Sequence, residues 1–429
     1  MSKLARHPST RGQAMSDSFD ERSGRRNDER ALTRRDMLQA SVLVGAGLAA
    51  GTGVAGAQGA AGGGAAGGTA LAPGAIGSKG SKGLDGINQR QDGTYETVPL
   101  RKDVVTISLC QTRVRAVDAK NPKPGLRDNL RHMLNMIDAA QGSMFGPKDL
   151  LFFHEFPITG YSNRWDRADA LRLAIEVPGE ETEEISKKAR QYGCYIVFGT
   201  YARDKDWPNH LLSLTNIIGP GGEIVGRSWK ARNIKGLWPN FELFTSTIHD
   251  NLDQFVEMYG WDKVVPVYRT DIGNITTTST QREPELPRAA AMKGCELFLR
   301  TATGGFSRAD VEATAIYNNM YSCVVNNAVS RDNPGFFASD DNFGGSCIYD
   351  PQGRLIAQAG PDNEEQEVVG RLPMAELRRR KRQPVVHMEL WKPMFDRYVG
   401  RYPANLFKDT MPANGQEAFA YLRDKARWK

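Results

Sequence analysis

Apolar residues recur along the chain in short runs that polar stretches and turns separate. Runs of this kind are typical of strands that are buried on one or both faces. The pattern predicts strands over residues 103–109, 149–153, 195–200, 211–218, 223–229, 272–279, 296–300, 324–329, 346–349, 355–358 and 368–372. Turn sequences at 219–222 and 350–353 would join neighbouring antiparallel strands.

Helical periodicity lies between these strands. One set of apolar residues falls on a single helix face: Leu126, Leu130, Met133, Leu134 and Ile137. Further helices are predicted over 180–192, 285–293 and 309–321. Strands that alternate with helices are typical of a layered α/β domain, and the hairpins argue against a purely parallel, doubly wound sheet.

The N-terminal residues carry a targeting pattern. Arg34 and Arg35 precede an apolar stretch, 40–57, which is rich in Gly and Ala and ends in a small-x-small sequence. Residues 1–57 thus resemble a bacterial twin-arginine export signal, which is an address and not an anchor. An amphipathic N-terminal helix is the alternative. We expect an exported protein, in the periplasm, cell envelope or medium, without stable membrane insertion.

The rest of the chain divides by composition. Residues 58–97 are rich in Gly and Ala and are predicted to be a flexible linker. The strands and helices define a domain over 98–385. Residues 386–429 contain too many aromatic residues for a disordered tail, and we expect this C-terminal arm to pack across a dimer interface.

Composition and charge exclude several classes of protein. A mean hydropathy of −0.48 excludes a polytopic membrane protein, and five Cys in 429 residues exclude a disulfide scaffold. The net charge of +6 falls to +3 without residues 1–57, so nucleic acid is not an expected partner. Nucleotide-binding glycine motifs and metal-type His/Cys spacings are absent from the sequence. No cofactor and no metal are therefore expected.

Three places could carry chemistry. Glu155 follows an apolar strand, where partial burial would raise the pKa of its carboxyl group and suit a general base. Lys230 directly follows the predicted strand 223–229, and an ammonium at this strand end could stabilise an oxyanion. The third place is the strand-to-helix junction at 276–285. Taken singly, Glu155 could be a strand-end salt bridge, Lys230 a solvated terminus and the Thr run ordinary strand sequence.

Short sequences around these places resemble the nitrilase superfamily, the carbon–nitrogen hydrolases, and are most like aliphatic amidases and carbamoyl hydrolases. The resembling segments run in family order and are 153–156 with 160–161, 177–182, 222–230, 282–285, 291–297, and 343–346 with 350–353. The resemblance implies an αββα four-layer sandwich that pairs into an eight-layer dimer or a higher homo-oligomer. It also implies catalysis by a Glu base, a Lys oxyanion residue and a Cys nucleophile.

The resemblance assigns Glu155 as base, Lys230 as oxyanion support and Glu242 as the second Glu that positions the nucleophile. The family Cys lies seven residues before the Glu of the Pro-Glu pair, and counting back from Glu285 reaches Thr278. A different register reaches Thr280. Neither is a Cys, so Thr278, Ser279, Thr280 or a water remain candidates for the attacking group.

We therefore expect hydrolysis of a non-peptide C–N bond in a small amide or N-carbamoyl compound. Nitriles are disfavoured, because the family route through a thioimidate needs sulfur. The alternative is a catalytically inactive protein that kept the fold for binding or assembly. The five Cys, including Cys295, are expected to be buried packing residues. Residues 378–382 are expected to form a solvated basic turn. Residues 300–306 and the loop 237–244 are expected to line the pocket.

Overall fold

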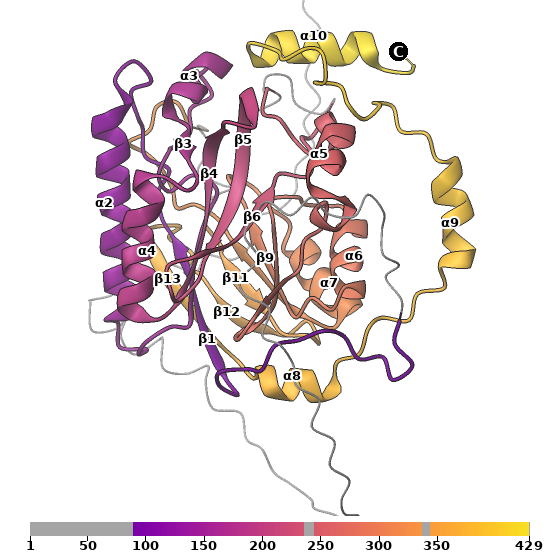
Figure 1. The fold of residues 1–429 in the computed structure, drawn as a ribbon. Helices are drawn as coiled ribbons and strands as arrows, with labels where there is room; N and C mark the ends of the chain where they lie inside the picture. The colour runs from indigo at the N-terminus through magenta and orange to yellow at the C-terminus, as the bar shows by residue number, and fades with distance from the viewer. Residues whose placement is uncertain (1–88, 236–243, 337–343, 429) are drawn as a thin grey trace, which may run out of the picture. The chain divides into compact units, whose positions relative to one another are not determined.

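Two β-sheets packed face to face form the centre of this computed structural model, which describes residues 89–235, 244–336 and 344–428 (Figure 1). The first sheet contains β1 (Val105–Gln111), β2 (Leu150–Phe153), β3 (Ile175–Glu176), β4 (Tyr195–Asp204), β5 (Trp207–Ile218), β6 (Ile224–Trp229) and β13 (Gln366–Leu372). The second contains β7 (Tyr268–Thr270), β8 (Gly273–Thr278), β9 (Leu297–Thr301), β10 (Tyr321–Val325), β11 (Cys347–Tyr349) and β12 (Leu355–Gln358).

Parallel and antiparallel pairs occur in both sheets. The first sheet has the order β13-β1-β2-β4-β5-β6, with β3 beside β4, and the second has the order β12-β11-β10-β9-β8-β7. In the first, β1, β2 and β4 run parallel, and in the second, β8, β9 and β10 do. The carboxyl ends of parallel neighbours therefore lie together at one edge of each sheet.

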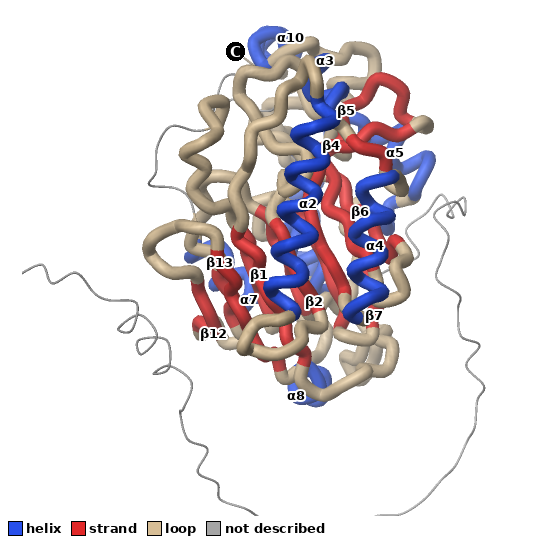
Figure 2. Tube along the Cα trace, turned by 90° about the vertical axis from the view of Figure 1, so that its left-hand side faces the viewer, coloured by secondary structure: helices blue, strands red, loops and turns tan. Residues whose placement is uncertain are grey.

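Helices cover the outer face of each sheet. On the first sheet lie α2 (Pro122–Gln141) and α4 (Glu180–Tyr192), which run side by side in Figure 2. On the second lie α6 (Glu285–Met292) and α7 (Arg308–Asn318). This arrangement is the predicted αββα four-layer sandwich.

Strand alternation divides the apolar residues between two interiors. Leu150 and Phe152 of β2 join the core between the two sheets. Leu151 and Phe153 of the same strand point to the opposite face and pack against α2 and α4. The strand carries apolar residues at every position because both of its faces are covered.

The helix and the strand on either side of residue 320 were predicted with wrong boundaries. The helix predicted over 309–321 ends at Asn318, because Asn319 takes the left-handed conformation, with φ 48°, and closes the helix. The next strand consequently begins at Tyr321 and ends at Val325, instead of covering 324–329. Between residues 231 and 262, where the sequence predicts no strand or helix, lies the amphipathic helix α5 (Leu252–Tyr259).

The predicted solvated turn at 378–382 was also wrong. Residues Met374–Arg380 form the helix α8, and Arg378 binds the buried carboxylate of Glu296 with two hydrogen bonds of 2.9 Å. Lys381 is buried, and its Nζ donates to the carbonyls of Asn318 and Asn319, 2.9 and 2.8 Å away. Tyr95, in the segment expected to be a linker, also hydrogen-bonds Glu296, at 2.9 Å.

Besides α5 and α8, three further short helices were not predicted: α3 (Arg167–Leu173), α9 (Met388–Arg397) and α10 (Gly415–Lys425). The last belongs to a small apolar cluster with Leu406 and Phe407. In contrast, α9 has no buried residue. None of the helices in the described part of the chain is long and apolar enough to cross a bilayer.

Candidate active site

Glu155 lies two residues beyond the carboxyl end of β2 and is 8% exposed. Its backbone passes directly over Gly199 of β4, whose amide donates to the carbonyl of His154 across 2.9 Å. A Cβ at Gly199 would come within 2.4 Å of the Glu155 Cα, so only glycine fits there. Strand packing thus fixes the place from which the carboxylate projects.

His154 supports the same segment from the interior. It is fully buried, and its Nδ1 accepts a hydrogen bond of 3.1 Å from the amide of Phe156. Its Nε2 therefore carries the proton and donates to Thr112 Oγ1, 2.9 Å away. Burial lowers the pKa of His154 to about 3, so the ring is neutral at physiological pH. The ring therefore bridges Phe156 and Thr112 through its two nitrogens.

Lys230 follows β6, and Thr278 is the last residue of β8. The two strands belong to different sheets, and Thr277 Oγ1 joins them by donating to Ser228 Oγ across 2.7 Å. Beyond the strands, Arg232 binds the carboxylate of Glu283 and the carbonyl of Gln281. The segments that follow Lys230 and Thr278 are thereby held together.

Thr278 is nearly inaccessible, at 5% exposure, and its Oγ1 accepts a hydrogen bond of 3.0 Å from the amide of Thr280. The Thr280 hydroxyl is buried and has no hydrogen-bond partner within 89–235, 244–336 and 344–428. Both residues lie at the register that the sequence assigned to the nucleophile. A hydroxyl there is far less acidic than a thiol and needs a stronger base.

The sequence did not single out Thr303, in the turn after β9. Its Oγ1 donates a hydrogen bond to Glu155 Oε2, although the two residues lie 148 positions apart. The next residue, Gly304, donates its amide to Asn327 Oδ1 at 2.9 Å, and its carbonyl accepts from Asn326 Nδ2 at 2.6 Å. The only available sequence signal was the position of Thr303 within the expected pocket wall, 300–306.

The structure thus gathers three of the four predicted residues at neighbouring strand ends. Thr303 links Glu155 to the end of β9, Arg300 of β9 pairs in register with Thr278, and Thr277 joins β8 to the strand before Lys230. Neither Glu155 nor Lys230 is without an interaction partner in the structure. Glu242 lies outside the described residues, as does most of the predicted wall 237–244.

The five Cys are buried and free, as predicted. Burial raises the pKa of Cys295 to about 11, and its Sγ lies 3.5 Å from the carbonyl oxygen of Leu297. A protonated, inaccessible thiol is a poor nucleophile. Within the described ranges, no group of three His, Cys, Asp or Glu residues could hold a metal ion.

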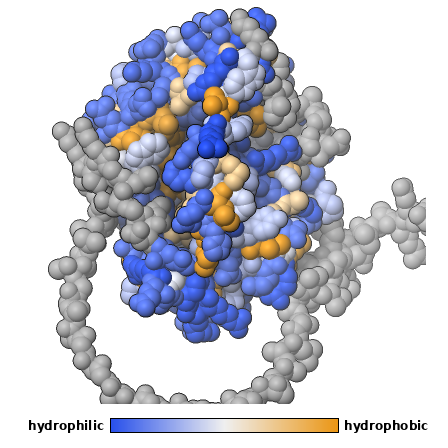
Figure 3. Space-filling model, turned by 90° about the vertical axis from the view of Figure 1, so that its right-hand side faces the viewer, coloured by the Kyte–Doolittle hydropathy of each residue, from blue (hydrophilic) through white to orange (hydrophobic). Residues whose placement is uncertain are grey.

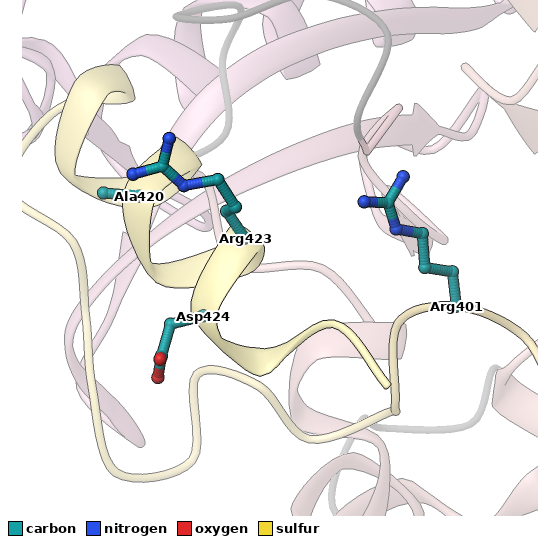
Figure 4. A pocket seen from close by; sticks show the side chains of 4 residues that line it. All are labelled: Arg401, Ala420, Arg423 and Asp424. Atoms are coloured by element: carbon teal, nitrogen blue, oxygen red, sulfur yellow. The ribbon is translucent and has the colours of Figure 1, made fainter. Parts of the chain in front are cut away.

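Two surface cavities involve the C-terminal segment. One, of about 240 Å³, lies between the loop 161–166 and the start of α10 and includes Phe244. The other, of about 340 Å³, is lined by Arg401, Ala420, Arg423 and Asp424 (Figure 4). The second lies on exposed side chains of the C-terminal arm, and Glu155, Lys230 and Thr278 do not line it.

Comparison with known proteins agrees with this architecture. The chain is 24% identical over 242 residues to a formamidase of Helicobacter acinonychis (strain Sheeba), which covers 53% of this chain. This chain spans 65% of the length of that relative. The NitFhit protein of C. elegans superposes with a TM-score of 0.52 at 17% identity, covering 70% of this chain and 66% of that one.

A carbon–nitrogen hydrolase from Helicobacter pylori G27 superposes with a TM-score of 0.50 at 15% identity, covering 69% of this chain and 95% of that one. At these identities the solved structures show the shared fold. The family model described as carbon-nitrogen hydrolase matches residues 107–382, which is most of the described domain. The chain therefore belongs to the carbon–nitrogen hydrolase family, the nitrilase superfamily.

Proposed function

We propose that this protein hydrolyses a non-peptide C–N bond in a small amide or an N-carbamoyl compound. The observation that carries the proposal is the placement of Glu155, a buried carboxylate that accepts a hydrogen bond from a hydroxyl at a neighbouring strand end. Lys230 and Thr278 lie at the ends of two further strands, which a hydroxyl pair joins. A base, a cation and hydroxyl groups at converging strand ends are the parts that acyl transfer needs.

In this proposal Glu155 takes the proton of the attacking group and later gives it to the leaving nitrogen. Lys230 stabilises the negative charge that develops on the carbonyl oxygen. Thr278 stands where the family has its Cys, and Glu242 positions the nucleophile. A hydroxyl nucleophile favours amides over nitriles. Because one relative is a formamidase, simple amides are the first substrates to test.

Ammonia release by the chain from residue 58 onward tests the proposal. The substrates are small amides, N-carbamoyl compounds and nitriles, and the variants are Lys230→Ala and Thr278→Ala. Lys205→Ala, which removes an exposed lysine that pairs with Asp206, is the matched control. We expect Lys230→Ala to lower the rate about 10²- to 10³-fold, because it removes the oxyanion partner.

The outcomes separate the candidate attacking groups. Loss of ammonia release in both variants indicates that Thr278 attacks. Loss of ammonia release in Lys230→Ala alone assigns the attack to another hydroxyl or to water. The second candidate function is a binding or assembly protein without catalysis, and the hydroxyl-only junction at Thr278 favours it. Absence of ammonia release across the whole panel would favour this second function over hydrolysis.

We further propose that the chain forms a homo-oligomer through α9. Five apolar side chains of this region are 49–79% exposed: Leu390, Trp391, Met394, Phe395 and Tyr398. Figure 3 views the side of the molecule on which α9 lies and shows hydrophobic patches among polar ones. A second copy would remove these side chains from water. Truncation after Gln383 should lower the mass measured by light scattering, and an unchanged mass would contradict this proposal.

Export by the twin-arginine pathway is proposed from the sequence of residues 1–57, which lie outside the described residues. Replacing Arg34 and Arg35 together by Lys should retain the precursor in the cytoplasm, because the pathway reads the arginine pair. Fractionation of cells that express each form would measure this. Equal export of both forms would contradict the proposal.

A further inference from the structure

Thr303 is the hydroxyl that the structure places on the proposed base. We infer that Thr303 Oγ1, and not the Thr278 hydroxyl at the family position, supplies the attacking oxygen. The inference rests on the proposed hydrolysis and names its nucleophile. A nucleophile and its base must lie within hydrogen-bond reach, and Thr303 Oγ1 donates directly to Glu155 Oε2.

Accessibility also favours Thr303. It is half-buried, whereas Thr278 is 5% and Thr280 6% exposed. An attacking atom must meet both the base and the substrate, and the substrate arrives from solvent. The Thr278 oxygen is in addition an acceptor for the amide of Thr280, at 3.0 Å, which stabilises the backbone turn after β8. Thr278 is therefore better suited to shape this junction than to attack.

The turn that carries Thr303 is held rigidly. Gly304 adopts a φ of 82°, which favours glycine, and both of its peptide groups are bound by fully buried asparagines. Asn327 Oδ1 accepts from its amide at 2.9 Å, and Asn326 Nδ2 donates to its carbonyl at 2.6 Å. A hydroxyl on a fixed turn loses little entropy when it attacks. The fixed turn therefore preorganises the Thr303 hydroxyl beside the carboxylate of Glu155, as a nucleophile requires.

The reaction balances with water as the only co-substrate. Thr303 Oγ1 gives its proton to Glu155 as it forms a bond to the amide carbon, and the oxyanion lies beside Lys230. The C–N bond then breaks, and Glu155 gives the proton to the nitrogen, which leaves as ammonia or an amine. Water next gives a proton to Glu155 and attacks the ester. The acid leaves, and the Thr303 oxygen regains its proton from Glu155.

Two measurements on the chain from residue 58 onward test this inference. The first is ammonia release by Thr303→Val, Thr303→Ser and Thr278→Val. The second is labelling with phenylmethylsulfonyl fluoride, which esterifies an activated hydroxyl and releases fluoride, followed by peptide mapping. Thr301→Val is the matched control, because Thr301 is the last residue of β9, two positions before Thr303. Its hydroxyl is buried and has no hydrogen-bond partner among the described residues.

We expect Thr303→Val to lower ammonia release at least about 100-fold, since only binding and oxyanion stabilisation would remain. Thr303→Ser should keep most of the rate, and Thr301→Val should change it little. Thr278→Val should lower the rate far less than Thr303→Val does. The label should map to Thr303 and disappear in Glu155→Gln. Undiminished ammonia release by Thr303→Val would overturn the inference and leave the proposed hydrolysis standing.

The labelling distinguishes the two proposals when no ammonia is released. A label on Thr303 that depends on Glu155 would support Thr303 as the nucleophile and would show that none of the tested compounds is a substrate. Absence of any label on Thr303 together with absence of ammonia release would overturn both. A label on Thr278 would return the attack to the family position.

Discussion

Thr277 Oγ1 donates a hydrogen bond of 2.7 Å to Ser228 Oγ, and this contact joins the two sheets at the point where the proposed site begins. Ser228 lies two residues before Lys230, and Thr277 lies one before Thr278. Ser228 Oγ also lies 3.2 Å from the hydroxyl oxygen of Tyr268, on β7. The spacing between Lys230 and the end of β8 therefore depends on a short chain of hydroxyl groups.

Replacing Thr277 by Val should lower both stability and activity. Loss of a buried hydrogen bond costs about 0.5–1.5 kcal/mol, and a small displacement of Lys230 should reduce kcat about tenfold or more. Thr276→Val is the matched control, because Thr276 donates to the carbonyl of Pro266, at 3.0 Å, on the other face of the strand. Urea unfolding and ammonia release would measure the two effects. Equal kcat values for the two variants would show that the hydroxyl chain does not set the site.

Gly199→Ala should disturb the proposed base directly. The new Cβ would lie 2.4 Å from the Cα of Glu155 and 2.6 Å from its carbonyl oxygen, and neither backbone atom can rotate away. We expect a loss of about 1–3 kcal/mol in stability and a marked fall in ammonia release. Gly360→Ala is the control, because its nearest neighbour would be 3.5 Å away. A Gly199→Ala variant as stable and active as the control would contradict this account of Glu155.

The layered fold was predictable because it depends on periodicity within short segments. Strand β2 is apolar at every position, and its two sets of side chains occupy two different cores. The site residues Glu155, Lys230 and Thr278 were identified by their positions at strand ends and by family resemblance. Their assigned chemical roles remain predictions.

Other features depend on contacts between residues far apart in the sequence. Thr303 meets Glu155 across 148 positions, and Arg378 meets Glu296 across 82. A run of basic residues gives no local indication that one of them binds a buried carboxylate, so the sequence predicts a solvated turn at residues 378–382. The early end of α7 depended on the left-handed backbone of Asn319, which the apolar pattern does not report.

Acid should destabilise the protein through His154. Its pKa in the folded state, about 3, lies below the value of 6.5 for an ordinary histidine. The unfolded chain therefore binds more protons between these values, and stability falls as the pH drops through this window. From pH 7 to pH 5 the loss from this residue should be about 2 kcal/mol. His154→Gln should flatten this part of the profile.

His387→Gln, which replaces an exposed histidine, is the control for that measurement. Buried His210, whose pKa is lowered to about 4, stays in both proteins and should preserve part of the acid sensitivity. Urea midpoints at pH 7 and pH 5 give the comparison. An unchanged pH dependence in His154→Gln would show that the His154 ring does not govern the acid response.

Among the basic residues 378–382, Arg378 should contribute most to the free energy of unfolding. Glu296 is fully buried, and besides Arg378 it accepts hydrogen bonds from the hydroxyl of Tyr95 and the amide of Asn274. Arg378→Met would leave this carboxylate without its cation, which costs about 3–5 kcal/mol in such pairs. Arg379→Met, on the exposed side of α8, should cost less than about 0.5 kcal/mol. The double variant Glu296→Gln with Arg378→Met should recover part of the loss, because the charge is then absent as well. Equal urea midpoints for the two single variants would mean that the ion pair contributes nothing to stability.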